Sequence, residues 1–510
     1  MSNKVRLRFA PSPTGPLHIG GLRTALYNYL VAKKLKGKLI LRIEDTDYSR
    51  FDKNAEKHII DSLKWCGIIP DESPNNPGKY GPYNQSGRKN IYKNYVDELV
   101  KKGFAYYAFD KKSELEELRK KSEQKGKNFI YNWKNREELK NSISLKKEEL
   151  KTLINNGDYV IRFKTVKSGN EKNYYHIKDQ LRGTIKIDLN ILDDKIIFKS
   201  DGMPTYHFAN VIDDYSMKIS HVIRGEEWLP SLPLHFLLYD AFEWKKPSFT
   251  HLPLILKPSG SGKLSKRDGQ KFGIPIYPIK WFDLKENDSY LGFKEMGFEP
   301  NALLNFICMI GWNPGDEREI FSIKKLIEVF SFQKINKSGG KYDFEKAKWF
   351  NQNYVKKISN TVFLDLINKN INDNLLKFIN RKKKILLIEL LKKRITFKND
   401  IISEINNILN FQTQDLDKTF IQNKWNTKIS HAVNSIKEKI KNSTITNERL
   451  KKYYFRVLKN QKIKIGEGMQ ALRLCITSKT YGPDLFEIIN ILGKRECLKR
   501  IDKSLKIIND

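Results

Sequence analysis

The first hundred residues alternate between strand-like and helix-like segments, and this order constrains the fold more than any other feature of the chain. Residues 4–10 alternate polar and apolar side chains, which predicts a strand, and a proline-rich loop follows. Leucine and tyrosine recur at helical spacing over residues 19–36, and Gly37 marks the end of that helix. A second strand is expected at 38–43 and a second helix at 54–65. This βαβ order predicts an α/β fold with a Rossmann-type parallel sheet and a ligand site at the C-terminal ends of its strands.

Beyond about residue 103 the regular alternation weakens. Residues 111–150 are strongly charged, and strand-like segments follow at 159–165 and 183–192, so we expect an inserted α+β subdomain. Apolar α/β character then returns, with a strand predicted at 220–224 and a helix at 229–242.

The last third of the chain, residues 351–510, has apolar residues at helical spacing, most clearly at 361–378, 384–395 and 400–410. Lysines fill the other helix faces, and no run of alternating hairpins is present. We therefore expect an all-α region. The basic segment 381–394 also fits a helix that lies on a membrane surface, but we favour a helix packed in a bundle.

The chain carries a large excess of positive charge. It has 510 residues, with 94 Lys and Arg against 59 Asp and Glu, a formal net charge of +35. Residues 351–510 hold 33 basic and 15 acidic side chains, so about half of the excess lies there. A nucleic-acid partner would explain this charge, and so would a genome whose codon use favours Lys, Asn and Ile. The distribution favours the C-terminal third as the part that binds a polyanion.

Three observations exclude other classes of protein. No uninterrupted apolar stretch reaches about 18 residues, so no membrane span is expected. The N-terminal residues lack the apolar core of a secretory signal, so we expect a cytoplasmic location. The four cysteines, Cys66, Cys308, Cys475 and Cys497, are far apart and form no CxxC motif, so neither a disulfide framework nor a cysteine-rich zinc site is expected.

The first segment with chemical character runs from Arg8 into the predicted helix. It reads Pro11-Ser12-Pro13-Thr14-Gly15-Pro16-Leu17-His18-Ile19-Gly20-Gly21. His18 stands at the start of a helix, where free backbone N–H groups favour a phosphate, and two glycines let a ligand approach the backbone closely. A histidine there can donate a hydrogen bond to a phosphate that gains charge. Taken alone, the segment is equally consistent with an incidental histidine at a helix start.

The second segment is Lys263-Leu264-Ser265-Lys266-Arg267, with Gly260 and Gly262 before it. Two lysines three residues apart on a flexible loop are able to hold a triphosphate and neutralise a leaving pyrophosphate. In a chain with so many lysines, a plain basic surface loop is the better interpretation of this segment alone.

Together the two segments resemble the motifs called HIGH and KMSKS in class I aminoacyl-tRNA synthetases. Gly21 replaces the last His of the first motif, and Leu264 and Arg267 replace Met and Ser in the second, as is typical of the glutamyl/glutaminyl branch. Further matching segments are Arg42-Ile43-Glu44-Asp45-Thr46-Asp47, Gly81-Pro82-Tyr83, Gln85-Ser86, Ser200-Asp201-Gly202, residues 204–211, residues 222–228 and Lys348-Trp349-Phe350-Asn351. The resemblance spans nearly the whole chain and is to the bacterial glutamyl-tRNA synthetases.

The resemblance implies an enzyme that ligates L-glutamate to tRNA(Glu) with ATP and Mg²⁺, through a glutamyl-adenylate. By position, the implied ATP-binding residues are His18, Gly20, Gly21, Glu227, Trp228, Lys263 and Lys266, of which His18, Gly20, Lys263 and Lys266 would be catalytic. The implied glutamate-binding residues are Arg8, Ser12, Glu44, Tyr206, Asn210 and Arg224. Some members hold zinc through cysteines in the inserted subdomain, but residues 103–133 contain no cysteine here, so no zinc or other protein-bound metal is expected. A monomer is expected.

The charges of the implied glutamate-binding residues also agree with the chemistry of that substrate. Glutamate carries two carboxylates and one ammonium, so its site needs guanidinium groups and an anion, which Arg8, Arg224 and Glu44 supply. Which arginine faces the side-chain carboxylate stays open. Without its neighbours, Glu44 would be interpreted as part of a solvated acidic turn.

The resemblance implies five parts of the chain. They are a Rossmann catalytic domain in two halves (1–105 and 200–256), an inserted acceptor-binding subdomain (106–199), the KMSKS loop with a stem-contact region (257–350), and a helical anticodon-binding region (351–510). In the last part, Arg473 and Gly482-Pro483 match the family's final helical region.

Four alternatives remain. A glutaminyl enzyme shares the motifs but has a β-barrel tail, which the helical pattern contradicts. A relaxed glutamyl enzyme would also charge the glutamine-type tRNA. A nucleotidyltransferase with an HxGH-type motif would not need this tail. A tRNA-binding paralogue with an inactive site disagrees with the intact His18, Lys263 and Lys266.

Overall fold

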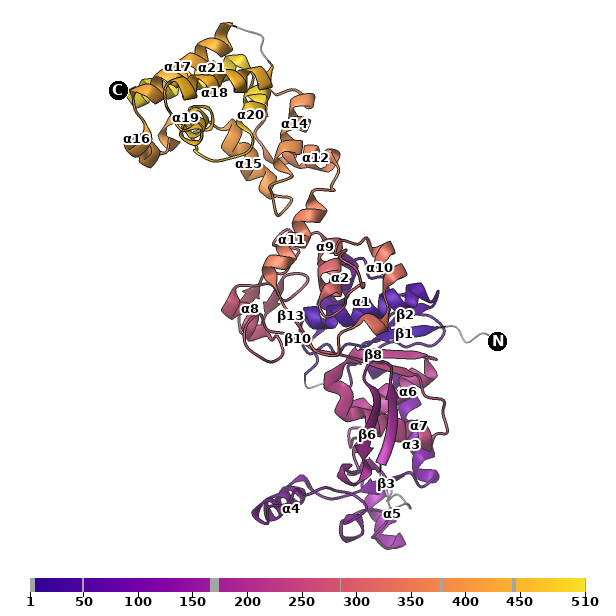
Figure 1. The fold of residues 1–510 in the computed structure, drawn as a ribbon. Coiled ribbons are helices and arrows are strands. Elements are labelled where there is room, and N and C mark those ends of the chain that lie inside the picture. The colour runs from indigo at the N-terminus through magenta and orange to yellow at the C-terminus, as the bar shows by residue number, and fades with distance from the viewer. Residues whose placement is uncertain are drawn as a thin grey trace. The chain divides into compact units, whose positions relative to one another are not determined.

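The computed structural model describes residues 5–47, 50–165, 174–284, 286–376, 379–442 and 446–509. The chain forms two compact units (Figure 1). The N-terminal unit comprises Met1–Glu295 and Leu303–Phe344, and the C-terminal unit comprises Met296–Ala302 and Glu345–Asp510. Lys4 of the strand predicted at 4–10 lies outside the described residues.

A six-stranded sheet forms the centre of the N-terminal unit, in the order β2-β1-β8-β9-β5-β6. Its strands are β1 (Arg6–Phe9), β2 (Lys38–Leu41), β5 (Tyr174–Asp179), β6 (Gly183–Asp188), β8 (His221–Gly225) and β9 (Ser248–Leu252). All neighbouring strands are parallel except the β5–β6 hairpin, which is antiparallel. The predicted Rossmann-type α/β fold is confirmed.

Helix α1 (Ile19–Lys34) connects β1 to β2 and packs on β1, β2 and β8. It ends two residues before the predicted end, because the chain turns at Lys36, which has a positive φ of 52°. Gly37 then passes so close to β1 that a Cβ there would lie 2.4 Å from the carbonyl oxygen of Val5. The second predicted helix is α2 (Lys53–Trp65), which begins one residue before the predicted start. Asp52 caps it, because its side chain accepts a hydrogen bond from the backbone N–H of Asn54.

Helices α3 (Lys89–Lys101), α6 (Tyr206–Ser216) and α7 (Leu232–Ala241) share a hydrophobic core with strands β8 and β9. The helix predicted at 229–242 begins later than expected. Residues Glu226–Ser231 form the short 3₁₀ helix η4, and α7 follows with Pro233 in its first turn. Proline fits a first turn because its missing N–H is not needed there.

The segment predicted as an insertion contributes to two sheets. β3 (Ala105–Ala108), β4 (Val160–Phe163) and β7 (Ile196–Phe198) form an antiparallel sheet, with α4 (Lys112–Gln124) and α5 (Lys147–Asn155) in the same region. β5 and β6 instead extend the large sheet, and the strand predicted at 183–192 ends at Asp188. β5 itself was not predicted. The division of the chain into five parts stays a prediction.

The remaining elements of the N-terminal unit carry the second motif. β10 (Ile255–Leu256) pairs with β13 (Gly340–Lys341), and β11 (Trp281–Asp283) pairs with β12 (Asp288–Tyr290). Between β10 and β11 in the sequence lies α8 (Lys266–Phe272), which begins inside the motif. Helix α9 (Pro300–Met309) follows, with its first residues assigned to the C-terminal unit, and then helix α10 (Ile323–Val329).

The C-terminal unit is built from helices, as predicted for residues 351–510. They are α11 (Phe344–Val355), α12 (Asn360–Asn370), α13 (Asp373–Leu376), α14 (Arg381–Leu391), α15 (Asp400–Leu409), α16 (Lys418–Lys424), α17 (Thr427–Asn442), α18 (Asn447–Asn460), α19 (Ile465–Thr477), α20 (Leu485–Leu492) and α21 (Lys494–Asn509). The apolar run at 361–378 becomes α12 and α13, and residues 377–378 lie outside the description.

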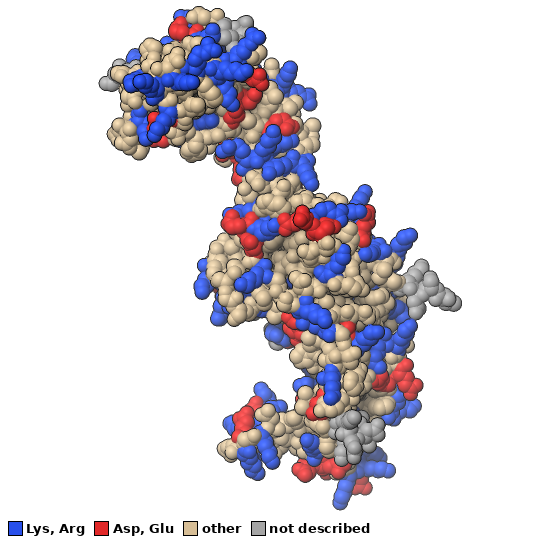
Figure 2. Space-filling view, in the orientation of Figure 1, with Lys and Arg blue, Asp and Glu red and all other residues tan. Residues whose placement is uncertain are grey.

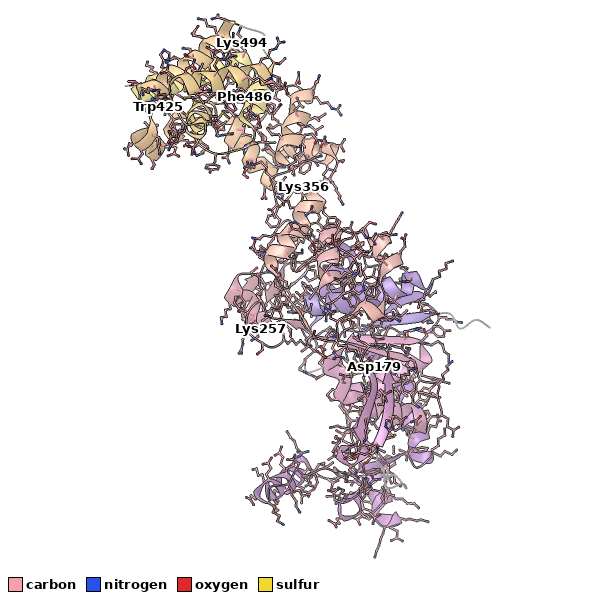
Figure 3. The ribbon with its side chains drawn as sticks, in the orientation of Figure 1. Asp179, Lys257, Lys356, Trp425, Phe486 and Lys494 are labelled. Atoms are coloured by element: carbon pink, nitrogen blue, oxygen red, sulfur yellow. The ribbon has the colours of Figure 1, made fainter. Side chains whose placement is uncertain are left out.

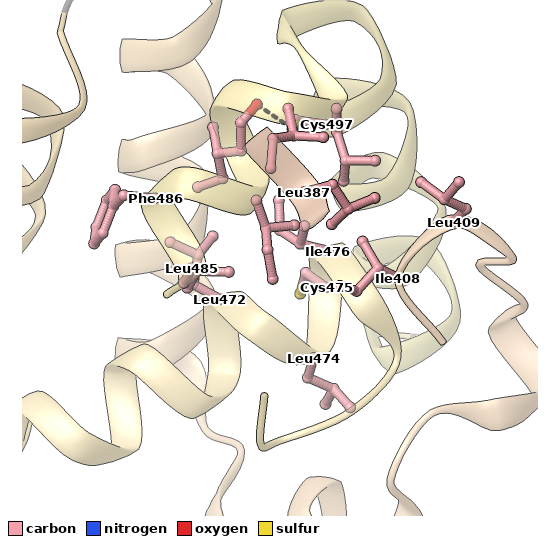
Figure 4. Close-up of a cluster of buried hydrophobic side chains, with 14 of the residues drawn as sticks. Leu387, Ile408, Leu409, Leu472, Leu474, Cys475, Ile476, Leu485, Phe486 and Cys497 are labelled. Atoms are coloured by element: carbon pink, nitrogen blue, oxygen red, sulfur yellow. Dashed lines mark hydrogen bonds between the residues drawn. The ribbon is translucent and has the colours of Figure 1, made fainter. Parts of the chain in front are cut away.

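A single hydrophobic core joins these helices, with Leu387, Leu472 and Phe486 among its residues (Figure 4). The basic segment at 381–394 forms α14, which buries Leu387, Ile388 and Leu391 in this core, so the bundle interpretation is confirmed. Among the described residues, no helix has the length and apolar character that crossing a membrane requires.

Candidate active site

A cavity of about 300 Å³ lies at the C-terminal ends of β1 and β8. Arg8 and Phe9 enter it from β1, and Arg224 and Gly225 enter it from β8. This is the edge where a parallel sheet binds ligands. The predicted residues in its wall are Arg8, Pro11, Ser12, Gly15, Pro16, Leu17, His18, Gly20, Gly21, Glu44, Tyr206, Asn210, Arg224, Glu227 and Trp228.

A second cavity, of about 380 Å³, adjoins the first. Both cavities share His18, Gly20, Gly21 and Glu227, and the second adds Lys263, Leu264 and Ser265. The structure therefore brings the two sequence motifs together around two cavities that share part of their walls. Of the other motif residues, Pro13 and Ile19 are buried, and Thr14 and Arg267 are exposed.

His18 occupies the N-cap of α1. Its Nδ1 accepts a hydrogen bond from the backbone N–H of Gly20, 3.1 Å away. In a neutral imidazole, an accepting Nδ1 leaves the proton on Nε2. That Nε2 atom is buried and has no partner. Burial, together with the charge of Lys263, lowers the pKa of His18 to about 4. His18 is therefore a neutral N–H donor in the wall of both cavities at neutral pH.

A buried cluster of charged side chains includes Arg8 and Glu44, which line the first cavity. Arg8 donates from Nε to Asp214 (3.0 Å), and Arg42 donates to both Asp214 (2.8 Å) and Glu44 (3.0 Å). Burial opposes its charge, but these carboxylates and Asp213 raise the pKa of Arg42 well above its ordinary value. The residue types were visible in the sequence as Arg42-Ile43-Glu44 and as two consecutive aspartates, but their pairing was not predicted.

Glu44 receives hydrogen bonds from Arg42 and from the Nδ2 of Asn210, 2.9 Å away. Burial raises the pKa of Glu44 in spite of Arg42 and Arg8. Its carboxylate is therefore not fully compensated by the protein, and a cation in the cavity would stabilise its charge.

Arg224 has different surroundings. Its Nε donates to Nε2 of His251 at 2.9 Å, one Nη lies 3.4 Å from Nδ1 of His235, and the other lies 3.5 Å from the carbonyl oxygen of Trp228. Burial lowers its pKa. The side chain of Tyr206 also hydrogen-bonds with Arg224, and its ring stacks on the ring of Trp228 with the centroids 4.3 Å apart. Neither His251 nor His235 was predicted as a site residue, and neither lies in a motif that would have indicated it.

The two motif lysines differ in position. Lys263 lines the second cavity and forms an ion pair with Glu227 at 3.2 Å. Lys266 lines neither cavity, because its Nζ lies 2.6 Å from both Asp283 and Glu286. Burial opposes its charge, but these two carboxylates raise the pKa of Lys266. Within the described ranges, no group of three or more His, Cys, Asp or Glu is placed to hold a metal ion.

Comparison with known proteins agrees with this geometry. The family model of the catalytic domain of class I tRNA synthetases (E and Q) matches residues 4–349, and the model of an anticodon binding domain matches residues 344–505. The chain is 47% identical to a glutamate–tRNA ligase of Christiangramia forsetii over 99% of both chains, and 48% identical to one of Flavobacterium psychrophilum over 99% of both. The chain belongs to the glutamate–tRNA ligase family.

The solved structures of this family agree in fold. A glutamate tRNA ligase from Elizabethkingia meningosepticum, crystallised in complex with its amino acid, superposes with a TM-score of 0.90 at 42% identity, covering 99% of this chain and 100% of that one. The predicted membership in the class I aminoacyl-tRNA synthetases, first indicated by the two motifs, is thereby confirmed, and the similarity extends over the full length of the chain. The roles of individual residues stay predictions.

Proposed function

We propose that this chain ligates L-glutamate to tRNA(Glu) with ATP, in two steps, for protein synthesis. The observation that carries the proposal is the wall of the first cavity, which combines the guanidinium groups of Arg8 and Arg224 with the carboxylate of Glu44. The full-length similarity to glutamate–tRNA ligases supports it.

Charge complementarity supports an acidic amino acid as the substrate. The guanidinium groups match carboxylates, and Glu44, whose charge the protein compensates incompletely, matches the ammonium group. Tyr206 and Asn210 close the same wall with polar groups, and Ser12 adds a hydroxyl.

The nucleotide would bind beside the residues that line both cavities. His18 offers its unpartnered Nε2–H to a phosphate oxygen, and Lys263 supplies a cation in the wall of the second cavity. In the first step, the glutamate α-carboxylate attacks the α-phosphate of ATP, forming glutamyl-adenylate and releasing pyrophosphate. In the second step, the 2′-OH of the terminal adenosine of tRNA attacks the activated carbonyl and releases AMP. The protein supplies position and charge stabilisation in both steps, with no covalent intermediate.

Mg²⁺ would enter with the triphosphate and neutralise part of its charge. Its ligands would come chiefly from phosphate oxygens and water, since the described residues contain no carboxylate cage. We further propose that the enzyme acts as a monomer in the cytoplasm, where translation takes place.

The C-terminal unit would hold the anticodon part of the tRNA. Figure 2 shows Lys and Arg side chains over much of its visible face. A small cavity of about 80 Å³ there is lined by Arg394, Arg473 and Tyr481. One Nη of Arg473 is buried without a partner, and burial lowers the pKa of Arg473, so a base acceptor there would satisfy it. Tyr481, 75% exposed, is free to stack on a base.

Amino-acid-dependent pyrophosphate exchange and tRNA charging test the proposal. We expect charging with glutamate, and we expect exchange to need tRNA, as is usual in this branch. Charging with glutamine but not with glutamate would contradict the substrate, and charging of the glutamine-type tRNA as well would indicate a relaxed enzyme. Arg473→Ala should raise the KM for tRNA, while Lys494→Ala, which removes an exposed charge from α21, should not (Figure 3).

Lys266 is proposed to stabilise the phosphates after it leaves Asp283 and Glu286. Lys266→Ala should cut pyrophosphate exchange by at least a hundredfold and leave tRNA binding unchanged. Lys271→Ala is the matched control, because it removes an exposed lysine from the same helix. Near-normal exchange by Lys266→Ala would remove Lys266 from the proposed mechanism.

A further inference from the structure

Arg224 is held by neutral groups rather than by a carboxylate. Its contacts include His251, His235, the carbonyl of Trp228 and the side chain of Tyr206. No carboxylate lies within ion-pair distance of it in the part of the chain that the structure describes. Arg8 and Arg42, in contrast, both pair with Asp214. Arg224 as a whole is 5% exposed, so it is a nearly buried cation without an ion-pair partner among the described residues.

The hydrogen bonds around His251 define its tautomer. Nε2 accepts from Nε–H of Arg224 at 2.9 Å, so the ring proton is on Nδ1. Nδ1 lies 2.8 Å from Oδ2 of Asp179 and donates to it. Both side chains are fully buried. Burial also lowers the pKa of His251, although Asp179 opposes this, so the ring stays neutral at neutral pH.

Asp179 is fixed by the backbone around it. It is the last residue of β5, in the middle of the N-terminal unit (Figure 3). Its Oδ1 accepts from the N–H groups of Leu181 and Arg182, and its Oδ2 accepts from the N–H of His251 at 3.1 Å. Three backbone donors hold this carboxylate in one orientation. It therefore orients His251, and His251 in turn orients Arg224.

We propose that Asp179 and His251 are positioning residues that aim Arg224 into the cavity and keep its charge free for a carboxylate of the amino-acid substrate. A direct carboxylate partner would fix Arg224 equally well, but it would neutralise the charge that the substrate needs. An imidazole between Asp179 and Arg224 supplies the orientation and keeps the anion one ring further away. This inference rests on the proposed function, because it assumes that the cavity binds glutamate.

The KM values for glutamate and for ATP distinguish a positioning role of His251 from a general structural role. His251→Leu removes the acceptor and should raise the KM for glutamate at least tenfold, while the KM for ATP stays within twofold and kcat changes less than the glutamate KM. His251→Gln keeps an oxygen acceptor and should restore the glutamate KM to within about threefold of wild type. His221→Leu is the matched control. His221 lies on β8, the strand next to that of His251, and its side chain contacts Ser220 rather than Arg224, so this variant should change neither KM.

A second measurement on the unmodified protein covers the case in which His251→Leu does not fold. Nitrogen-15 NMR of histidine-labelled protein reports the tautomer of each ring, and His251 should carry its proton on Nδ1. A proton on Nε2, or on both nitrogens, at pH 7 would overturn the inference. So would a glutamate KM of His251→Leu within twofold of wild type. If the wild-type protein charges no tRNA with glutamate, the proposed function itself is wrong.

Discussion

Asp214 is the residue whose loss should disturb the site most, because it is the shared anion of a closed set of buried charges. Arg8, Arg42 and Arg88 contribute three positive charges, and Glu44, Asp213 and Asp214 contribute three negative ones, all with side chains at most 3% exposed. Asp214 accepts from Arg8 at 3.0 Å and from Arg42 at 2.8 Å.

The variant Asp214→Asn keeps the shape of the side chain and removes its charge. One positive charge is then left without a counter-ion among side chains that are at most 3% exposed. Breaking a buried ion pair from one side costs about 3–5 kcal/mol, most of it from the charge left behind. The Asn oxygen retains one hydrogen bond to an arginine, so we expect a loss of about 3 kcal/mol in the unfolding free energy of the N-terminal unit.

Scanning calorimetry measures this loss, with the transition of the N-terminal unit identified by its rise in temperature when ATP is added. Asp61→Asn is the matched control, because it also removes a carboxylate from an ion pair, with Lys57 on the exposed face of α2. That pair should contribute at most about 1 kcal/mol. The reasoning fails if Asp214→Asn and Asp61→Asn lower the transition temperature equally. It also fails if Asp214→Asn leaves the glutamate KM unchanged, because Arg8 loses its anchor in that variant.

Other consequences of the structure are open to direct measurement. Gly468→Ala should destabilise the C-terminal unit by about 1–3 kcal/mol in urea unfolding, because its Cβ would lie 2.2 Å from Cδ2 of Leu458. Gly466→Ala on the same helix is the control: its Cβ would meet no atom within 4 Å, so this variant should be neutral or slightly stabilising. The hydrogen bond with Arg6 lowers the pKa of Glu72 from an ordinary 4.5 to about 2. The stabilisation by Glu72 is therefore present above pH 4.5 and is lost as the pH falls towards 2. In Glu72→Gln, the free energy of unfolding should change less with pH over this range than in the wild type. The affinity for tRNA should fall steeply and linearly with the logarithm of salt concentration in a filter-binding titration, and a flat response would contradict a phosphate-binding surface.

Local pattern predicted the helices and strands of the βαβ unit well, because each is specified by its own periodicity. Helix α1 and strand β2 begin at the predicted residues 19 and 38. Strand β5 was missed, and so was the place of the hairpin β5–β6 in the large sheet, because the pairing of β5 with β9 joins segments about 70 residues apart. The periodicity of side chains within a segment does not indicate a pairing strand so far away in the sequence.

For the site, the motifs predicted the residues that line the two cavities but not the state of each side chain. The distance of Lys266 from the cavities depends on Asp283 and Glu286, which follow it by 17 and 20 residues in a separate hairpin. The imidazole contact of Arg224 depends on β8 and β9 lying side by side, with Arg224 in register with His251. Both features arise only when the sheet and the hairpin are assembled.

The two arginines of the cavity show why an acidic amino acid fits it better than a neutral one. Asp214 already offsets much of the charge of Arg8, and Glu44 shares Arg42 with Asp214. Arg224 instead contacts two imidazoles, a carbonyl and the side chain of Tyr206, and none of these is a carboxylate. Glutamate brings two negative charges and one positive, so its net charge neutralises one buried cation. Glutamine is neutral overall and would leave that cation desolvated and unpaired, which costs more than the hydrogen bond that its amide returns. The preference for glutamate should therefore depend on the absence of a carboxylate beside Arg224. His235→Asp would supply one, and it should weaken glutamate binding more than it weakens glutamine binding.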